Sequence, residues 1–173
     1  WDDTDQSGSQ SFANVDGSGI DIEVRYSDNM FDRNSVPNLY TAATAPSPEI
    51  IGTLRFTNDR MPVIEPTYIT IIFSEEVYLD EVSAVGLSTR LGQQENLVVE
   101  AMTAVGNLIA ATSYGTNTPG LVALDRDGDA SYHSRGLGAQ EAGLYGDTTY
   151  GWTEEAIKSI TFSVFTTEFD EDV

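Results

Sequence analysis

The feature that most constrains the fold of this chain is an alternation of apolar and polar side chains in short β-rich runs. Residues 20–26 show it most clearly, with two interleaved sets of side chains: Ile20, Ile22, Val24 and Tyr26 against Asp21, Glu23 and Arg25. Successive side chains of a strand point to opposite faces, so this run predicts a half-buried strand with one face in water. An Asp-Gly pair at 16–17 predicts a hairpin turn that joins a short strand at 11–15 to the strand at 20–26.

Further runs rich in β-branched and aromatic residues follow along the chain. They predict strands at 50–58, 67–74, 77–89, 97–105, 108–114, 121–125 and 157–167. The pair Gly106-Asn107 predicts a two-residue turn with positive φ at both positions, joining two of these strands in a hairpin. Residues 153–156 are interpreted as one helical turn, and no longer stretch has helical periodicity. About eight to ten short strands with turns between them predict an all-β fold, a single β-sandwich of the jelly-roll type.

Two irregular stretches separate the predicted strands. Residues 28–49 form a long loop interrupted by Pro37, Pro46 and Pro48, and residues 115–152 are rich in glycine and acidic side chains. The length fits one sandwich domain over residues 1–173. Within it, residues 1–10 are interpreted as flexible or donated to a neighbouring molecule, and 168–173 as an acidic tail.

The chain is strongly acidic, with 28 acidic and 8 basic residues and a formal net charge of −20. This charge repels phosphate backbones and anionic lipids, which argues against nucleic acid and membrane surfaces as partners. Salt or divalent cations would relieve the self-repulsion, and a medium outside the cell supplies both. Solubility alone is the alternative reason for the acidity.

Several observations bear on location. The chain contains no cysteine, which excludes disulfides, thiolate zinc sites and cysteine nucleophiles. No run of about 18 apolar residues occurs, so no segment is predicted to span a membrane. The opening residues WDDTDQSGSQ have the character of a mature start after signal-peptide removal. We therefore expect a secreted or cell-surface protein.

Three stretches of the chain have a distinctive pattern: Phe73-Ser74-Glu75-Glu76-Val77, Ala104-Val105-Gly106-Asn107-Leu108-Ile109 and Ile157-Lys158-Ser159-Ile160-Thr161-Phe162. These stretches resemble a group of secreted bacterial surface proteins, common in cyanobacteria and marine bacteria, that often carry a C-terminal sorting signal. The resemblance covers roughly residues 67–165 and implies a jelly-roll sandwich at the cell surface or in the matrix. It implies no particular reaction, because these are core and turn residues.

An acidic loop is the candidate metal site. Asp125, Asp127 and Asp129 alternate around Gly128, which would let their carboxylates converge on one hard cation. The Ser131 carbonyl falls in the next alternate place, and Glu141 or Asp147 could complete the shell. The sixth and twelfth places hold Ala130 and Gly136, so this is not an EF-hand. The spacing predicts a Ca²⁺ site; the alternative is a solvated loop in which each aspartate starts a turn.

Aromatic side chains gather just after this loop. Four of them are candidate ligand-binding residues: Tyr132, Tyr145, Tyr150 and Trp152. Rings beside carboxylates suit sugar binding, because sugar faces stack on rings while acids accept hydroxyl protons. The alternative is that these rings fill the edge of the sandwich.

No catalytic constellation is apparent in the sequence. His133 is the single histidine and Ser134 is its neighbour, but adjacent positions do not make a Ser-His pair, and no G-x-S-x-G motif occurs. We therefore predict a non-enzymatic, extracellular structural or adhesive protein of the cell surface or matrix, stabilised by calcium and capable of self-assembly into filaments or layers. The alternative prediction is a carbohydrate-binding module, with glycans as partners.

Overall fold

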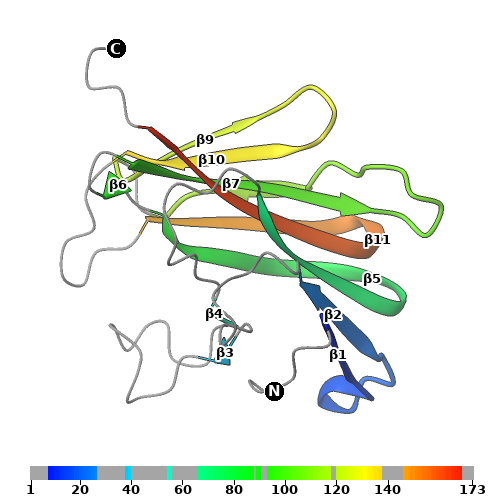
Figure 1. Ribbon diagram of the computed structural model, residues 1–173. Coiled ribbons are helices and arrows are strands. Elements are labelled where there is room, and N and C mark those ends of the chain that lie inside the picture. Colours follow the sequence, from blue (N-terminus) through cyan, green and yellow to red (C-terminus); the bar gives the residue numbers. More distant parts are fainter. Residues whose placement is uncertain are drawn as a thin grey trace.

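The computed structural model describes residues 8–26, 38–39, 54–55, 66–87, 89–90, 93–117, 120–137 and 146–168 (Figure 1). Most of these residues are in strands, and one short 3-10 helix, η1, joins the first two strands. The strands are β1 (Ser9–Phe12), β2 (Ile22–Tyr26), β3 (Asn38–Leu39), β4 (Leu54–Arg55), β5 (Thr67–Leu87), β6 (Thr89–Arg90), β7 (Gln93–Met102), β8 (Ser113–Gly115), β9 (Val122–Arg126), β10 (Tyr132–Gly136) and β11 (Gly146–Glu168), and η1 spans Val15–Gly17. The predicted all-β class is confirmed.

One antiparallel sheet of nine strands contains every described strand except the β3–β4 pair. Its order is β1-β2-β5-β11-β7-β10-β9, with β6 added to β7 and β8 added to β11. No described helix is long and apolar enough to cross a membrane.

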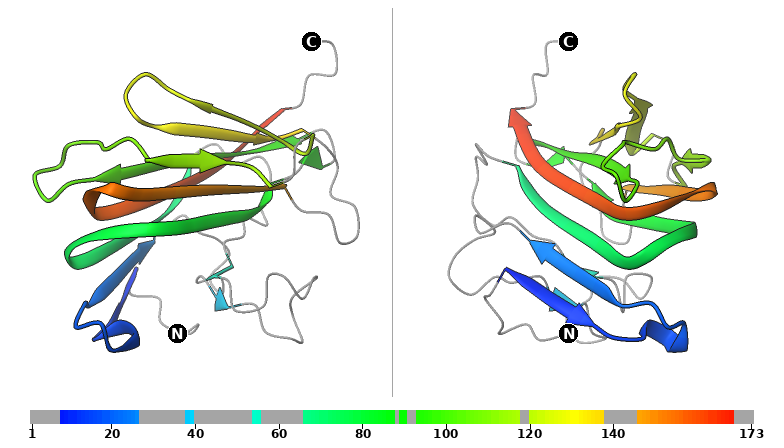
Figure 2. Two further views of the ribbon diagram at one scale, coloured as in Figure 1. Left: turned by 180° about the vertical axis from the view of Figure 1, so that it is seen from behind. Right: turned by 90° about the vertical axis from the view of Figure 1, so that its right-hand side faces the viewer.

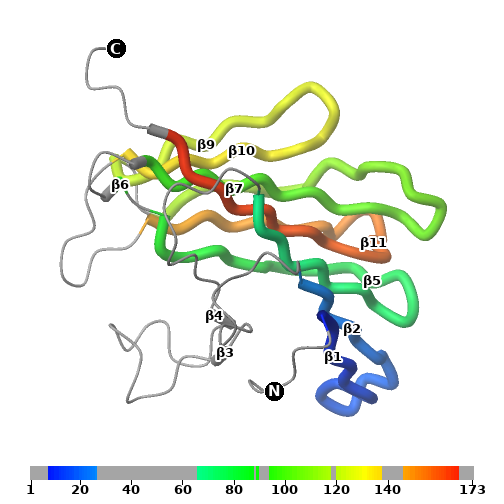
Figure 3. Tube along the Cα trace, in the orientation of Figure 1, coloured from blue at the N-terminus to red at the C-terminus, as the bar shows by residue number. Residues whose placement is uncertain are grey.

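Two long strands turn this single sheet into a sandwich. β5 and β11 pair with each other along most of their length, and both double back in Figure 3. The pairing shifts register on either side of Ile157, where the ribbon bends. The first part of β5 therefore lies in one layer with β2, the second part of β11 and β7, while the second part of β5 lies in the other layer with the start of β11 and β8.

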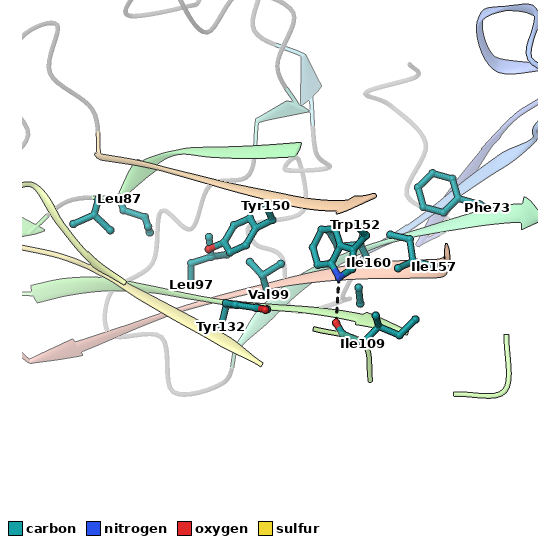
Figure 4. Packing of buried hydrophobic residues seen from close by; sticks show 12 residues of the cluster. Phe73, Leu87, Leu97, Val99, Ile109, Tyr132, Tyr150, Trp152, Ile157 and Ile160 are labelled. Atoms are coloured by element: carbon teal, nitrogen blue, oxygen red, sulfur yellow. Dashed lines mark hydrogen bonds between the residues drawn. The ribbon is translucent and has the colours of Figure 1, made fainter. Parts of the chain in front are cut away.

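The core fills the space between these two layers, which the two views of Figure 2 show from behind and from the side. One continuous cluster includes Tyr150 and Trp152 from one layer and Leu97, Val99 and Ile160 from the other (Figure 4). A second, smaller cluster consists of Val24, Tyr26 and Ile69. The sandwich follows from this packing; the jelly-roll connectivity within it stays a prediction.

The bend changes four predicted elements: the runs 67–74 and 77–89, the turn 153–156 and the strand 157–167. The runs 67–74 and 77–89 are one strand, β5, which ends at Leu87. Residues 153–156 belong to β11 and form no helical turn, so that prediction is wrong. The register shift also makes Ile157 and Ile160 both buried, although strict alternation would place them on opposite faces.

The predicted hairpin at 97–114 is present only near its turn. Thr103 N–H donates to the Asn107 carbonyl and Gly106 N–H donates to the Thr103 carbonyl, so three residues lie between the paired ends. Only Gly106 has positive φ, which corrects the predicted two-residue turn. After the Met102–Leu108 bridge the chain leaves β7, and β8 pairs with β11 in the other layer.

The N-terminal strand is paired inside its own chain, since β1 runs antiparallel to β2 from Ser9–Arg25 to Phe12–Ile22. The expected donation of residues 1–10 to a neighbour is thus not what residues 9 and 10 do in this structure. Residues 1–7 and the tail from 169 onward lie outside the described residues, as does the 28–49 loop except for β3 and the 50–58 strand except for β4.

Candidate functional site

The aspartates of the candidate calcium loop lie on a tight β-hairpin. Asp125 is in β9, while Asp127 and Asp129 are in the turn that leads to β10. Asp127 N–H donates to the Ser131 carbonyl, and Ala130 N–H donates to the Asp127 carbonyl. Ala130 has a φ of 72°, so the left-handed position of this turn is Ala130, while Gly128 does not have a positive φ.

The turn uses part of the predicted ligand set for its own hydrogen bonds. The Asp129 carboxylate accepts from the Ser131 N–H at 3.2 Å, and the Ser131 carbonyl is engaged by Asp127. This is the self-capping geometry in which an aspartate starts a turn. Within the described part of the chain no three acidic or histidine side chains are grouped to hold a metal ion. Glu141, which was expected to complete the shell, lies outside the described residues.

Sequence reasoning missed a second oxygen-rich turn, between β1 and β2. Asn14 accepts from Gly19 N–H at 2.7 Å through its side chain, and Asp21 accepts from Asn14 N–H at 2.8 Å through its carboxylate. Asn14 and Asp16 both have positive φ. The alternate spacing of Asn14, Asp16 and Ser18 before Gly19 is the signal in the sequence, and a hairpin turn alone does not account for it.

The candidate sugar-binding rings are in the core. Tyr132 and Trp152 have no exposed surface and Tyr150 has 1%. These three rings present no face to solvent, so they offer no stacking surface for a sugar in this structure; Tyr145 lies outside the described residues. Tyr150 and Trp152 alternate along β11, and together with Tyr132 of β10 they belong to the core cluster between the layers.

Each polar end of these buried rings has a hydrogen-bond partner. Trp152 Nε1 donates to the Ile109 carbonyl at 3.1 Å (Figure 4). The hydroxyls of Tyr150 and Ser134 are 2.9 Å apart, and the Tyr132 hydroxyl accepts from Ala111 N–H at 2.8 Å. Burial raises the pKa of both tyrosines above its usual value, with these hydrogen bonds opposing the rise. The buried rings and their hydrogen bonds therefore connect the two layers of the sandwich.

His133 lies on the outer face of the sheet and takes part in a local network. Its Nε2 is 3.2 Å from Asn96 Oδ1, and its ring stacks on Phe165 with centroids 6.0 Å apart. Ser134, its neighbour, points to the opposite face and pairs with Tyr150. The two side chains are separated by the sheet, as expected for adjacent strand residues.

Acidic side chains gather where the β5–β11 ribbon bends. Glu75 and Glu76 in β5, and Glu154 and Glu155 in β11, are all exposed beside the Val77–Ile157 pair. Two hydrogen bonds hold this corner in place. Glu76 Oε1 accepts from Ala104 N–H, and Lys158 Nζ donates to the Ser74 carbonyl.

Protein-family models, curated proteins and solved structures were compared with the chain, and none of them matches it. The resemblance to secreted bacterial surface proteins therefore stays a prediction.

Proposed function

We propose that this chain is a non-enzymatic structural or adhesive protein of an extracellular surface or matrix, stabilised by calcium and able to self-associate. The observation that carries the proposal is that several side chains with hydroxyl and indole groups are buried in the core. The hydroxyls of Tyr132, Tyr150 and Ser134 and the Trp152 indole are buried and bonded between the layers. They support a rigid scaffold rather than a reactive surface.

The charge of the chain supports the role of calcium. A net charge of −20 opposes both compaction and association of copies, and bound divalent cations would reduce that repulsion. The aspartate hairpin is the proposed place, with the exposed side chains of Asp125 and Asp127 as carboxylate ligands. Oxygen donors of this kind suit calcium.

Thermal unfolding with and without calcium tests the proposal. Calcium at a hundredfold excess over its dissociation constant should stabilise the fold by about 2.7 kcal/mol through mass action. The Asp125→Ala, Asp127→Ala double variant should lose this shift, while Glu154→Ala, Glu155→Ala, with the same change of charge, should keep it. The same melting temperature in calcium and in chelator would refute calcium stabilisation.

Carbohydrate binding is the second candidate, favoured by one exposed ring. Tyr114 of β8 is 47% exposed and packs on the buried Tyr132 ring, with centroids 4.7 Å apart. A ring held in this way can stack on a sugar without losing much side-chain freedom. A glycan array would detect binding that Tyr114→Ala abolishes and that Tyr78→Ala, at another exposed ring, leaves intact. Silence across the array would exclude this candidate.

A further inference from the structure

One edge of the large sheet has backbone groups that are available for pairing. β9 is the last strand in the sheet order, and Figure 1 shows it outermost. Leu137 N–H donates to the Leu121 carbonyl at one end of the β9–β10 ladder, and Asp127 N–H donates to the Ser131 carbonyl at the other. Because hydrogen-bonded and non-hydrogen-bonded pairs alternate in an antiparallel ladder, the residues between them are assigned in turn.

This alternation places three residues of β9 in non-hydrogen-bonded pairs with β10. They are Val122, Leu124 and Arg126, which lie opposite Gly136, Ser134 and Tyr132. The N–H and C=O groups of these three residues point away from β10, toward the outer side of the edge. No described strand pairs with that side.

The local charge distinguishes this edge from the rest of the chain. Residues 103–124 contain no charged side chain, and β9 itself carries one aspartate and one arginine, for a net charge of zero. Two copies with a charge of −20 each repel one another most where acidic residues face each other. The β9 edge lets two copies approach without that repulsion.

We propose that β9 pairs antiparallel with β9 of a second copy, in a two-fold dimer whose sheet continues across both chains. This inference rests on the self-association included in the proposed function and names its surface. A two-fold axis at Leu124 sets Val122 opposite Arg126 of the second copy, so that all three outward residues exchange hydrogen bonds. Axes at Asp125 or Arg126 would put like charges directly opposite each other, which is unfavourable.

The outer face of the same pairing is complementary in charge. With the axis at Leu124, Ala123 lies opposite Asp125 of the second copy, and Ala123 is flanked by Arg135 of its own chain. Because Ala123 carries only a methyl group, the long Arg135 side chain can extend over it toward that carboxylate. The symmetry repeats this contact on both sides of the axis.

Sedimentation equilibrium of the full chain, up to about 1 mM because a short-strand interface is small, tests the dimer. Arg126→Pro removes one outward donor from each copy while leaving the β10 ladder intact, and should lower the association constant about tenfold. Arg126→Ala keeps the donor and should remain within about twofold of the parent. Far-UV circular dichroism checks that each variant folds.

Two substitutions at Ala123 should change the association constant in opposite directions, and this test does not depend on the proline variant. In chelator, where no calcium neutralises Asp125, Ala123→Glu sets a like charge opposite Asp125 of the second copy and should weaken the dimer, while Ala123→Lys should strengthen it. An oligomer whose association constant is the same in all these variants would overturn the β9 interface and leave self-association standing. A wild-type chain that is monomeric throughout would overturn both.

Discussion

The buried hydroxyl pair between the two layers gives the sharpest prediction about what holds the sandwich together. Ser134 of β10 and Tyr150 of β11 belong to different layers, have 0% and 1% exposure, and their oxygens are 2.9 Å apart. Ser134→Ala leaves the Tyr150 hydroxyl buried without this partner, and Tyr150→Phe does the same to Ser134. Each single variant should lower the free energy of unfolding by about 1–3 kcal/mol.

The double variant should be less destabilised than the sum of the two single variants. Removing both partners leaves no buried polar group without its bond, so the coupling in a double-mutant cycle should be about 1–2 kcal/mol. Urea unfolding followed by circular dichroism at constant m-value measures it. Thr148 is the comparison: its Oγ1 is buried and forms no hydrogen bond of ordinary length in the described structure, although it approaches the Tyr150 hydroxyl closely enough to lower the pKa of that group, so Thr148→Val should change the free energy of unfolding by less than about 1 kcal/mol. Additive single effects, or a strongly destabilised Thr148→Val, would refute this reasoning.

Two further predictions concern close packing and pH. A Cβ at Gly151 would lie 2.5 Å from the Asp80 carbonyl oxygen, so Gly151→Ala should cost about 1–3 kcal/mol, whereas Gly128→Ala meets nothing within 4 Å and should cost less than about 1 kcal/mol in the same urea assay. The raised pKa values of Tyr132 and Tyr150 keep these groups protonated in the folded state after the unfolded chain has released its protons, so their contribution is complete below about pH 10 and is lost as the pH rises through the folded values. Alkaline titration at 295 nm should therefore show late tyrosines that ionise together with unfolding; ionisation of every tyrosine at its usual pKa without unfolding would contradict it.

The alternation of side chains was sufficient to predict the class of the fold, because burial of one face of a strand makes every second residue apolar. It predicted β2 to within two residues at its start, and it found β9 in the run 121–125. The alternation did not predict β10, because Tyr132–Gly136 mixes aromatic, polar and glycine residues. Polar side chains on both faces of this strand form hydrogen bonds, His133 with Asn96 on one face and Ser134 with Tyr150 on the other, so no face of it is uniformly apolar.

The bend of the β5–β11 ribbon could not be predicted from local sequence. Glu75, Glu76, Glu154 and Glu155 have the composition of a turn or a helix start, yet ladder pairing on both sides keeps them in strands. Tertiary pairing overrode local propensity there. The same limit applies to the aromatic residues, because a ring that fills a core and a ring that receives a sugar have the same spacing in sequence.

The most direct test of the account is the oligomeric state of the wild-type chain in calcium-containing buffer and in chelator, measured by sedimentation at matched ionic strength. We predict association in calcium that weakens in chelator, because the copies must overcome the repulsion of a −20 charge. Monomers of the same mass in both buffers, at every concentration, would contradict a calcium-stabilised, self-associating structural protein.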